Sequence, residues 1–336
     1  PLVKARDLEG AYGYINLTGT WIISPKFDSL GDFSSQGLAS AQIKDQNCGY
    51  INKSDQYVIQ PNFTWCEDFD NNGLALVEYE NERVGFINLD GTWAIEPQFL
   101  DADNFAENGL APAQDENERV GFINLDGTWA IEPQFLDAYN FAENGLAPAQ
   151  DENERWGFIN LNGTWAIEPQ FLDAYNFAEN GLAPAQDENR KWGYIDISGG
   201  WVIEPKFAGS SSFNNVGVAL VLDEISNKRL IDTFGNFITQ SDVSFYPNNF
   251  DNNKLIKASI NDGSYTKYGY LDPRGNWVIS PIHSYCSQLS DLFYKCSLNL
   301  NTLYYNLNGD NRVPFSYYYE LEEARNNSID QNENDI

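Results

Sequence analysis

Glycine recurs in this sequence at a fixed interval. The glycines that stand 36 residues apart are Gly13, Gly49, Gly85, Gly121, Gly157 and Gly193. Arg229 occupies the next position in this register, and Gly269 restores the pattern 40 residues later. Self-similarity at such a period is typical of solenoids, propellers and other arrays, in which each unit buries apolar surface against its neighbours. The chain is therefore predicted to be a repeat protein.

The period divides almost the whole chain into copies of one unit. We predict a single array over residues 1–319, with an acidic polar tail at 320–336. The copies fall at about 1–36, 37–72, 73–108, 109–144, 145–180, 181–216, 217–255, 256–289 and 290–319, with the seventh and ninth degenerate. The only differences between residues 85–120 and 121–156 are Asp103/Tyr139 and Val120/Trp156. Such fidelity suits a structural or multivalent module better than an active site built from unlike residues.

One unit, residues 145–180, is expected to form three short strands. GLAPAQ is an apolar strand candidate, and the polar stretch DENER after it reads as a turn. WGFINL and TWAI then flank Asn162-Gly163, a dipeptide typical of a two-residue hairpin turn. Pro169 is expected to end the third strand, because proline cannot donate to a ladder. The sequence therefore predicts a three-stranded antiparallel meander, followed by an ordered loop with Phe171 and Phe177 in the core.

Both faces of this meander carry apolar side chains. A two-residue loop would pair Asn160 with Trp165 and place Trp165 on the face of Phe158. Ile159 would then lie on the opposite face. A lone antiparallel sheet has one polar face, so each meander is expected to be covered on both sides by neighbouring units.

The recurring pattern G-[YF]-I-[ND]-x-x-G-x-W-x-I-x-P-x-F resembles the WG-containing repeats of bacterial proteins, also called KWG repeats. Trp156-Gly157 and Trp192-Gly193 carry the dipeptide itself, whereas other copies have Tyr12, Cys48, Val84 or Val120 before the glycine. The match covers about residues 1–310. The resemblance implies a repeat protein, often exported or surface-associated, and it implies no catalytic residues.

Two arrangements of the repeats are compatible with this pattern. A closed β-propeller often completes one blade from both chain ends, but Leu2–Arg6 aligns with Leu38–Gln42, so the chain starts in register at the first strand of a unit. We therefore expect an all-β fold in which the meanders stack as an open β-solenoid or superhelix. The alternative is a closed β-propeller with eight or nine blades.

The composition limits the partners. Forty-nine acidic and twenty basic residues give a formal charge of -29, so nucleic acids and anionic membranes are expected to be repelled. No apolar run approaches the ~20 residues that cross a bilayer. The acidic turns read as solvated loops, with Ca²⁺ binding as a weak alternative and no other cofactor expected. The chain begins at Pro1 and contains no Met, which is typical of a processed product.

The four cysteines form two close pairs in the sequence, Cys48 with Cys66 and Cys286 with Cys296. Their spacings match no CxxC motif, and the single histidine, His283, does not complete a zinc site. Two local disulfides and buried free thiols remain equal alternatives.

No catalytic motif is present. The sequence has no P-loop, no GxGxxG that opens a helix and no GxSxG, and one histidine leaves no choice of catalytic triad. We therefore expect a non-catalytic scaffold for protein interaction or self-assembly that is extracellular or surface-associated and forms filaments through its terminal strand. The alternative function is a carbohydrate-binding, lectin-like β-propeller.

The positions that vary between near-identical copies are the expected contact surface. A side chain that changes while its surroundings stay the same is more often exposed than buried. The candidate contact residues are Asp103, Tyr139, Tyr175, Trp156 and Trp192. The tryptophans of the third strand, such as Trp129 and Trp165, are instead expected to pack in the core, because each can bury about 200 Å² of apolar surface.

Overall fold

The computed structural model describes residues 2–7, 9–16, 19–79, 82–238, 243–245, 255–261, 265–290, 293–298, 301–306 and 308–310. The chain divides into two compact units. Unit 1 contains Pro1–Glu80, Ile87–Thr92 and Cys286–Ile336, and unit 2 contains Asn81–Phe86 and Trp93–Tyr285. No helix among the described residues is long and apolar enough to span a membrane. The acidic tail predicted at 320–336 lies outside the described residues.

The described secondary structure consists of strands. In chain order up to residue 102 they are β1 (Val3–Arg6), β2 (Tyr12–Ile15), β3 (Trp21–Phe27), β4 (Ser29–Leu30), β5 (Leu38–Gln42), β6 (Cys48–Asn52), β7 (Tyr57–Phe63), β8 (Trp65–Cys66), β9 (Ala75–Tyr79), β10 (Arg83–Ile87), β11 (Trp93–Phe99) and β12 (Asp101–Ala102). From there to residue 210 they are β13 (Ala111–Gln114), β14 (Val120–Ile123), β15 (Trp129–Phe135), β16 (Asp137–Ala138), β17 (Leu146–Gln150), β18 (Trp156–Asn160), β19 (Trp165–Phe171), β20 (Asp173–Ala174), β21 (Ala183–Gln186), β22 (Trp192–Ile195), β23 (Trp201–Phe207) and β24 (Gly209–Ser210). The remaining strands are β25 (Ala219–Leu222), β26 (Lys228–Ile231), β27 (Val243–Phe245), β28 (Ile256–Asn261), β29 (Thr266–Leu271), β30 (Trp277–His283), β31 (Tyr285–Ser290), β32 (Phe293–Leu298) and β33 (Asn301–Asn306).

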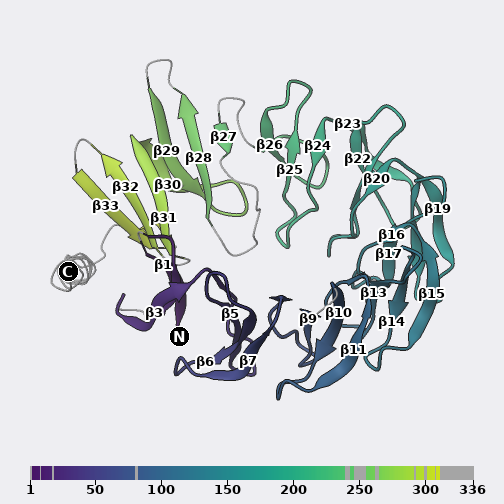
Figure 1. Ribbon diagram of the computed structural model, residues 1–336. Coiled ribbons are helices and arrows are strands. Elements are labelled where there is room, and N and C mark those ends of the chain that lie inside the picture. Colours follow the sequence, from purple (N-terminus) through teal and green to yellow (C-terminus); the bar gives the residue numbers. More distant parts are fainter. Residues whose placement is uncertain are drawn as a thin grey trace. The chain divides into compact units, whose positions relative to one another are not determined.

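Each complete repeat forms a four-stranded antiparallel sheet, which corrects the expected three-stranded meander. The sheets with four strands in chain order include β4–β7, β12–β15, β16–β19, β20–β23 and β27–β30 (Figure 1). The added strand is only two residues long and lies in the connector that was expected to be a loop. In β16, Asp137 pairs with Gln150 and Ala138 with Ala149. Two residues show no periodicity, so the sequence gives no sign of this strand.

The third long strand runs through the proline that was expected to end it. β19 continues from Trp165 past Pro169 to Phe171. On the partner strand β18, Trp156 pairs with Phe171 and Phe158 pairs with Ile167. Only Gly157 lies between the two paired residues on that strand. Three residues therefore oppose one, and Pro169 sits in this bulge, where no ladder hydrogen bond is required of it.

The hairpin between β18 and β19 is longer than predicted. The N–H of Asn160 donates to the carbonyl of Thr164 and that of Gly163 to the carbonyl of Asn160, both over 2.9 Å. The loop thus has three residues, with Gly163 at φ 76°. Trp165 pairs with Ile159 instead of Asn160. The expectation that Trp165 shares the face of Phe158 is therefore wrong.

The core lies between successive sheets. The central residues of β17 and the first four of β18 are buried without alternation, so both faces of these strands are covered, as predicted. Phe158, Phe171 and Phe177 are buried and cluster with Ala183 and Ile195 from the next sheet. The expected core role of the recurrent phenylalanines is thereby confirmed. β19 alternates between buried and exposed residues and has one polar face.

The prediction of an open β-solenoid or superhelix is wrong. β32 and β33, from the C-terminal end of the described chain, belong to the same compact unit as β1–β7 from its beginning (Figure 1). In an open array each sheet packs only on its neighbours in sequence, so the first and last sheets would lie far apart. Separate four-stranded antiparallel sheets that follow one another along the chain are typical of a β-propeller. The alternative prediction, a β-propeller, is therefore the fold that the structure supports.

Candidate interaction surface

Some acidic groups in the repeat have a structural task in the turns. The carboxylate of Asp151 accepts hydrogen bonds of 2.9 Å from the N–H groups of Asn153 and Arg155. Asp115 makes the same contacts one repeat earlier, and the N–H of Arg119 lowers the pKa of Asp115 below its usual range. These carboxylates stabilise the turn in the manner of Asx caps.

Other acids pair with arginines of the preceding repeat in unit 2. The ion pairs recur at a spacing of one repeat and are Arg83–Glu116 at 3.8 Å, Arg119–Glu152 at 3.6 Å and Arg155–Glu188 at 2.8 Å. The glutamates are largely exposed, so each pair contributes at most about 1 kcal/mol. Their role is to fix the relation of one sheet to the next.

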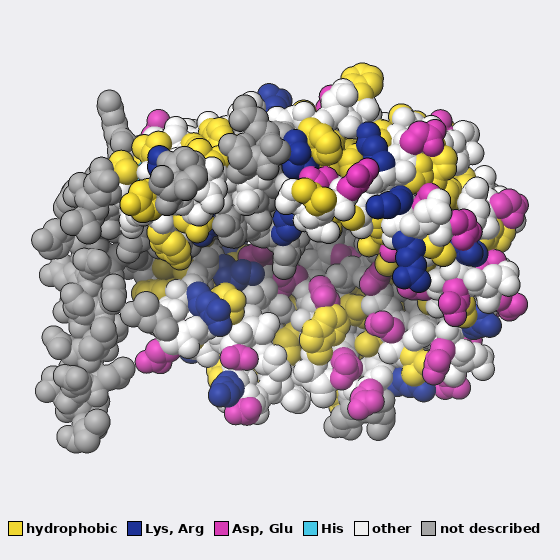
Figure 2. All heavy atoms as spheres, turned by 90° about the horizontal axis from the view of Figure 1, so that it is seen from above, with side chains coloured by type: hydrophobic (Ala, Val, Ile, Leu, Met, Phe, Trp, Pro, Cys, Tyr) yellow, Lys and Arg dark blue, Asp and Glu magenta, His cyan; other side chains and the backbone are white. Residues whose placement is uncertain are grey.

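Three aspartates have neither of these roles. Asp101, Asp137 and Asp173 occupy the same position in the short strands β12, β16 and β20. No lysine or arginine among the described residues forms an ion pair with these carboxylates. Acidic and basic side chains are both spread over the face seen in Figure 2. Over the whole sequence, 49 acidic residues face 20 basic ones, so positive charge is scarce in the protein.

The three aspartates act on one another electrostatically. Partial desolvation raises the pKa of Asp137, and the charge of Asp101 raises it further, although the N–H of Ala138 opposes both. Desolvation and the charge of Asp137 likewise raise the pKa of Asp173. A raised carboxyl pKa means that the ionised form is disfavoured in the folded protein. These carboxylates are therefore poised to gain from an external cation.

Two tyrosines flank the aspartates. The ring of Tyr139 stacks on Trp156 with centroids 5.0 Å apart, and the ring of Tyr175 stacks on Trp192 at 5.1 Å. The two tyrosine rings are 6.3 Å apart. Desolvation and the charge of Asp137 raise the pKa of Tyr139 to about 12, so its hydroxyl stays protonated at neutral pH. We call Asp101, Asp137, Asp173, Tyr139 and Tyr175 the acid–tyrosine row.

The acid–tyrosine row borders a hollow in unit 2. Its volume is about 440 Å³, and Asp101, Asp137 and Tyr139 line it together with Gln114 and Gln150. The hollow thus combines negative charge, an aromatic ring and amide groups. Such a surface can bind a basic side chain through ion pairing and cation–π contact.

The predicted contact residues divide into two groups. Asp103 is exposed, and Tyr139 and Tyr175 are half-buried. Trp156 and Trp192 are only 5% and 6% exposed, so the expectation that they are surface positions is wrong. Each lies beneath a tyrosine and supports its ring. Whether these residues contact a partner stays a prediction.

Sequence reasoning missed Asp101, Asp137 and Asp173. All acids of the repeat were interpreted as solvating the turns, because a linear sequence does not separate an acid that caps a turn from one that does not. The recurrence of Asp beside Ala immediately after the third strand was the available signal. This recurrence can be interpreted only once the short strand is known, because that strand places the three carboxylates in register.

The aspartates of the row are expected to reduce stability. Because the pKa values of Asp137 and Asp173 are raised on folding, the folded protein binds protons more tightly, and stability falls as the pH rises from about 4 through the folded-state values. Asp137→Asn combined with Asp173→Asn should therefore raise Tm at pH 7, with the gain vanishing near pH 3. Asp115→Asn, which removes a carboxylate of lowered pKa, should bring no gain. A double variant that melts below the parent at pH 7 would contradict the assigned repulsion.

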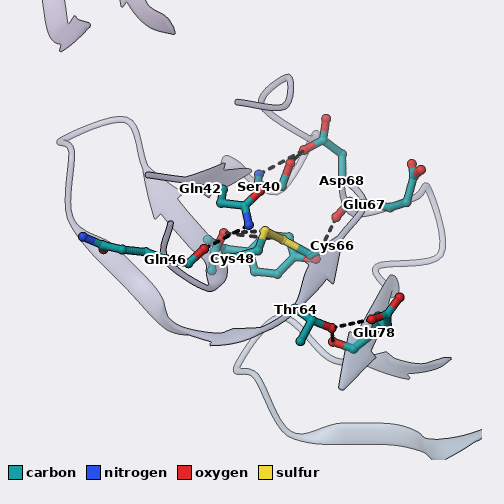
Figure 3. The surroundings of a disulfide bond; sticks show 11 residues. Ser40, Gln42, Gln46, Cys48, Thr64, Cys66, Glu67, Asp68 and Glu78 are labelled. Carbon is teal, nitrogen blue, oxygen red and sulfur yellow. Dashed lines mark hydrogen bonds between the residues drawn. A yellow bond between two sulfur atoms is a disulfide. The ribbon is translucent and has the colours of Figure 1, made fainter. Parts of the chain in front are cut away.

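The cysteines form disulfides that take the place of packing contacts. Cys48 of β6 is bonded to Cys66 of β8, among side chains that make their own local hydrogen bonds (Figure 3). One hydrogen bond there joins Ser40 Oγ to the Asp68 carboxylate over 2.8 Å. Two repeats later, Val120 and Ala138 occupy the cysteine positions and lie in one core cluster. A second disulfide joins Cys286 of β31 to Cys296 of β32.

The tryptophans of the third strands pack against other side chains of the protein. Trp129, Trp165 and Trp201 are half-buried, and each packs edge-on against a phenylalanine of the preceding repeat with centroids 5.4 to 5.6 Å apart. This geometry is an interlock between sheets. It leaves less ring surface for stacking on a sugar.

Comparison with known proteins identifies the family of the repeats. The repeats and four-stranded sheets define the chain as a repeat protein of β-propeller type. A sequence model described as "WG containing repeat" matches residues 12–46, 49–82, 85–118, 121–154, 156–190 and 192–224. The chain belongs to this WG-containing repeat family, which confirms the resemblance seen in the sequence. No curated protein matches the chain.

Several solved structures match the chain at low identity. The computationally designed Ika8 protein is 10% identical with a TM-score of 0.48, covering 80% of this chain and 93% of its own. BamB from Moraxella catarrhalis is 8% identical with a TM-score of 0.46, covering 81% and 93%. The C-terminal WD40 domain of Sif2 is 8% identical with a TM-score of 0.47, covering 82% and 95%.

Proposed function

We propose that this protein is a non-catalytic scaffold that binds a basic protein partner through the acid–tyrosine row. The observation that carries the proposal is the register of Asp101, Asp137 and Asp173, which repel one another and form no ion pair with a described lysine or arginine. Lysine or arginine side chains of a partner would relieve this repulsion. The acids would then contribute affinity and a fast association rate.

The tyrosines support the same proposal. Tyr139 and Tyr175 are held by Trp156 and Trp192, so their rings are positioned before a partner arrives. Rigid aromatic side chains bind at a low cost in conformational entropy and are frequent anchors of protein interfaces. Arginine stacks well on such rings.

The disulfides support an oxidising location. All four cysteines of the sequence are paired. Disulfides persist outside the cytosol and are rare within it. This favours an extracellular or cell-surface scaffold.

Self-assembly is a second candidate function. Within the described residues the sheet β1–β3 has no short strand beside β1, whereas β4 and β16 cover the equivalent strands of other sheets. The free edge of β1 offers backbone groups to a second copy of the chain.

Affinity capture from the native source tests the partner proposal. The wild-type protein should enrich a basic protein, and Tyr139→Ala combined with Tyr175→Ala should reduce its recovery at least tenfold. Tyr265→Ala serves as the control, because Tyr265 is an exposed tyrosine outside the row. Equal recovery with the double variant would refute the role of the row. Saturable binding to a glycan array would favour the lectin alternative, and light scattering of the same samples reports self-association.

A further inference from the structure

A second hollow in unit 2 lies along the turns that precede the first long strands. It has a volume of about 970 Å³ and is lined by equivalent turns of successive repeats. Its lining includes the buried rings of Phe141, Phe177 and Phe213 and the glutamates Glu107, Glu143 and Glu179. We call it the leucine–glutamate groove, because Leu161 also lines it.

The turn geometry explains every residue of this segment except the glutamate. In the turn Ala142–Gly145, the N–H of Ala142 donates to Leu146 and that of Gly145 to Ala142. Gly145 has a φ of 78°, which glycine adopts without strain. Asn144 accepts a hydrogen bond of 3.1 Å from Leu146. Glu143 is exposed and has no contact that supports the turn.

The same assignment holds in the neighbouring repeats. Asn108 and Asn180 bond to the leucines two residues later, over 3.0 and 3.1 Å. Glu107 and Glu179 are exposed and have no ion pair with a described lysine or arginine. A row of glutamates without a structural task therefore follows the groove.

Exposed apolar side chains recur beside these glutamates. Leu125, Leu161 and Ile197 stand at one position of three successive repeats and are 44%, 50% and 62% exposed, and of the three Leu161 lines the groove. A Cβ on Gly145 would lie 3.9 Å from Cδ1 of Leu161, so this leucine leans over the turn. Single exposed leucines are common, but Leu161 lines the same hollow as three glutamates and three phenylalanine rings.

We propose that the leucine–glutamate groove binds an extended segment of a protein partner in which basic and apolar side chains alternate. Charge complementarity identifies this occupant, because the rim carries one glutamate per repeat. The apolar side chains of the segment would cover the leucines. An extended chain fits better than a compact group, because the glutamates recur once per repeat along the groove. The groove shares no lining residue with the hollow of the acid–tyrosine row.

Binding of fluorescent synthetic peptides tests this proposal. The probe is a 12-residue peptide of alternating lysine and leucine, and the reference peptide has serine in place of leucine. We expect the wild-type protein to bind the probe at least tenfold more tightly in 0.15 M salt. Glu143→Gln combined with Glu179→Gln should weaken binding of the probe about tenfold, and Leu161→Ser about fivefold.

Matched controls separate this groove from other surfaces. Glu168→Gln and Val202→Ser change an exposed glutamate and a 50% exposed valine on third strands outside the groove, and both should bind within twofold of wild type. Asp137→Asn combined with Asp173→Asn should also bind within twofold, because those residues belong to the acid–tyrosine row. Equal binding of the two peptides, or equal losses in groove and control variants, overturns the proposal. A loss confined to the Asp137 and Asp173 variant overturns it as well and leaves the proposed function standing.

Discussion

The substitution Gly157→Ala is expected to destabilise the protein by about 3 kcal/mol or more, although it adds one methyl group. A Cβ atom on Gly157 would lie 2.6 Å from the carbonyl oxygen of Ile167 and 2.8 Å from the nitrogen of Pro169. Both are backbone atoms of the bulge on β19, so no side-chain rotation relieves the overlap. Relief requires the bulge to move away and the pairing of Trp156 with Phe171 to weaken.

Urea denaturation followed by tryptophan fluorescence measures this effect. Gly200→Ala is the matched control, because its Cβ would meet only side-chain oxygens, that of Ser198 at 3.4 Å and those of Asp196 at 3.6 and 3.9 Å, and no backbone atom. The control should stay within about 0.5 kcal/mol of the parent, as is usual for surface substitutions. Gly121→Ala should reproduce the loss, since its Cβ would lie 2.5 Å from the carbonyl of Ile131. If Gly157→Ala and Gly200→Ala unfold at the same urea concentration, the close approach of the bulge does not explain the recurrent glycine.

The sequence shows that glycine recurs every 36 residues, but it does not show why glycine is required at these positions. Sequence patterns identified the long strands, because their apolar residues and turn dipeptides have known spacings. They misplaced the end of β19, because proline is excluded from a regular ladder and the sequence does not reveal that Pro169 lies in a bulge. They also missed β16, since a strand of two residues has no period.

The candidate surface was predictable only in part. Variation between copies pointed to Tyr139 and Trp156, and the structure places both at one contact, with the tyrosine half-buried over a buried tryptophan. Exposure could not be inferred, because paired changes at Tyr139 and Trp156 also arise when two side chains pack together. The sequence does not distinguish Asp137 from the other acidic residues of the repeat. The structure does, because it places Asp137 in β16, where its charge interacts with those of Asp101 and Asp173.

Removal of the disulfide between Cys48 and Cys66 is expected to lower the free energy of unfolding by roughly 3 kcal/mol, without loss of the fold. The bond closes a segment with a sequence separation of 18, and a loop of this length loses conformational entropy of that order in the unfolded chain when it is cross-linked. The fold should survive Cys48→Val combined with Cys66→Ala. Val120 and Ala138 occupy the same two positions two repeats later and are buried there in one cluster.

Reducing conditions decide whether the loss comes from the cross-link. Without reductant the double variant should unfold at a lower urea concentration than the wild type. With reductant the wild type loses both disulfides and the variant loses the bond between Cys286 and Cys296. Neither protein then keeps a cross-link, so the difference between them should fall to near zero. A difference that persists in reductant would assign the loss to packing at Cys48 and Cys66. Equal unfolding without reductant would show that the contact between β6 and β8 needs no covalent bond, as between Val120 and Ala138.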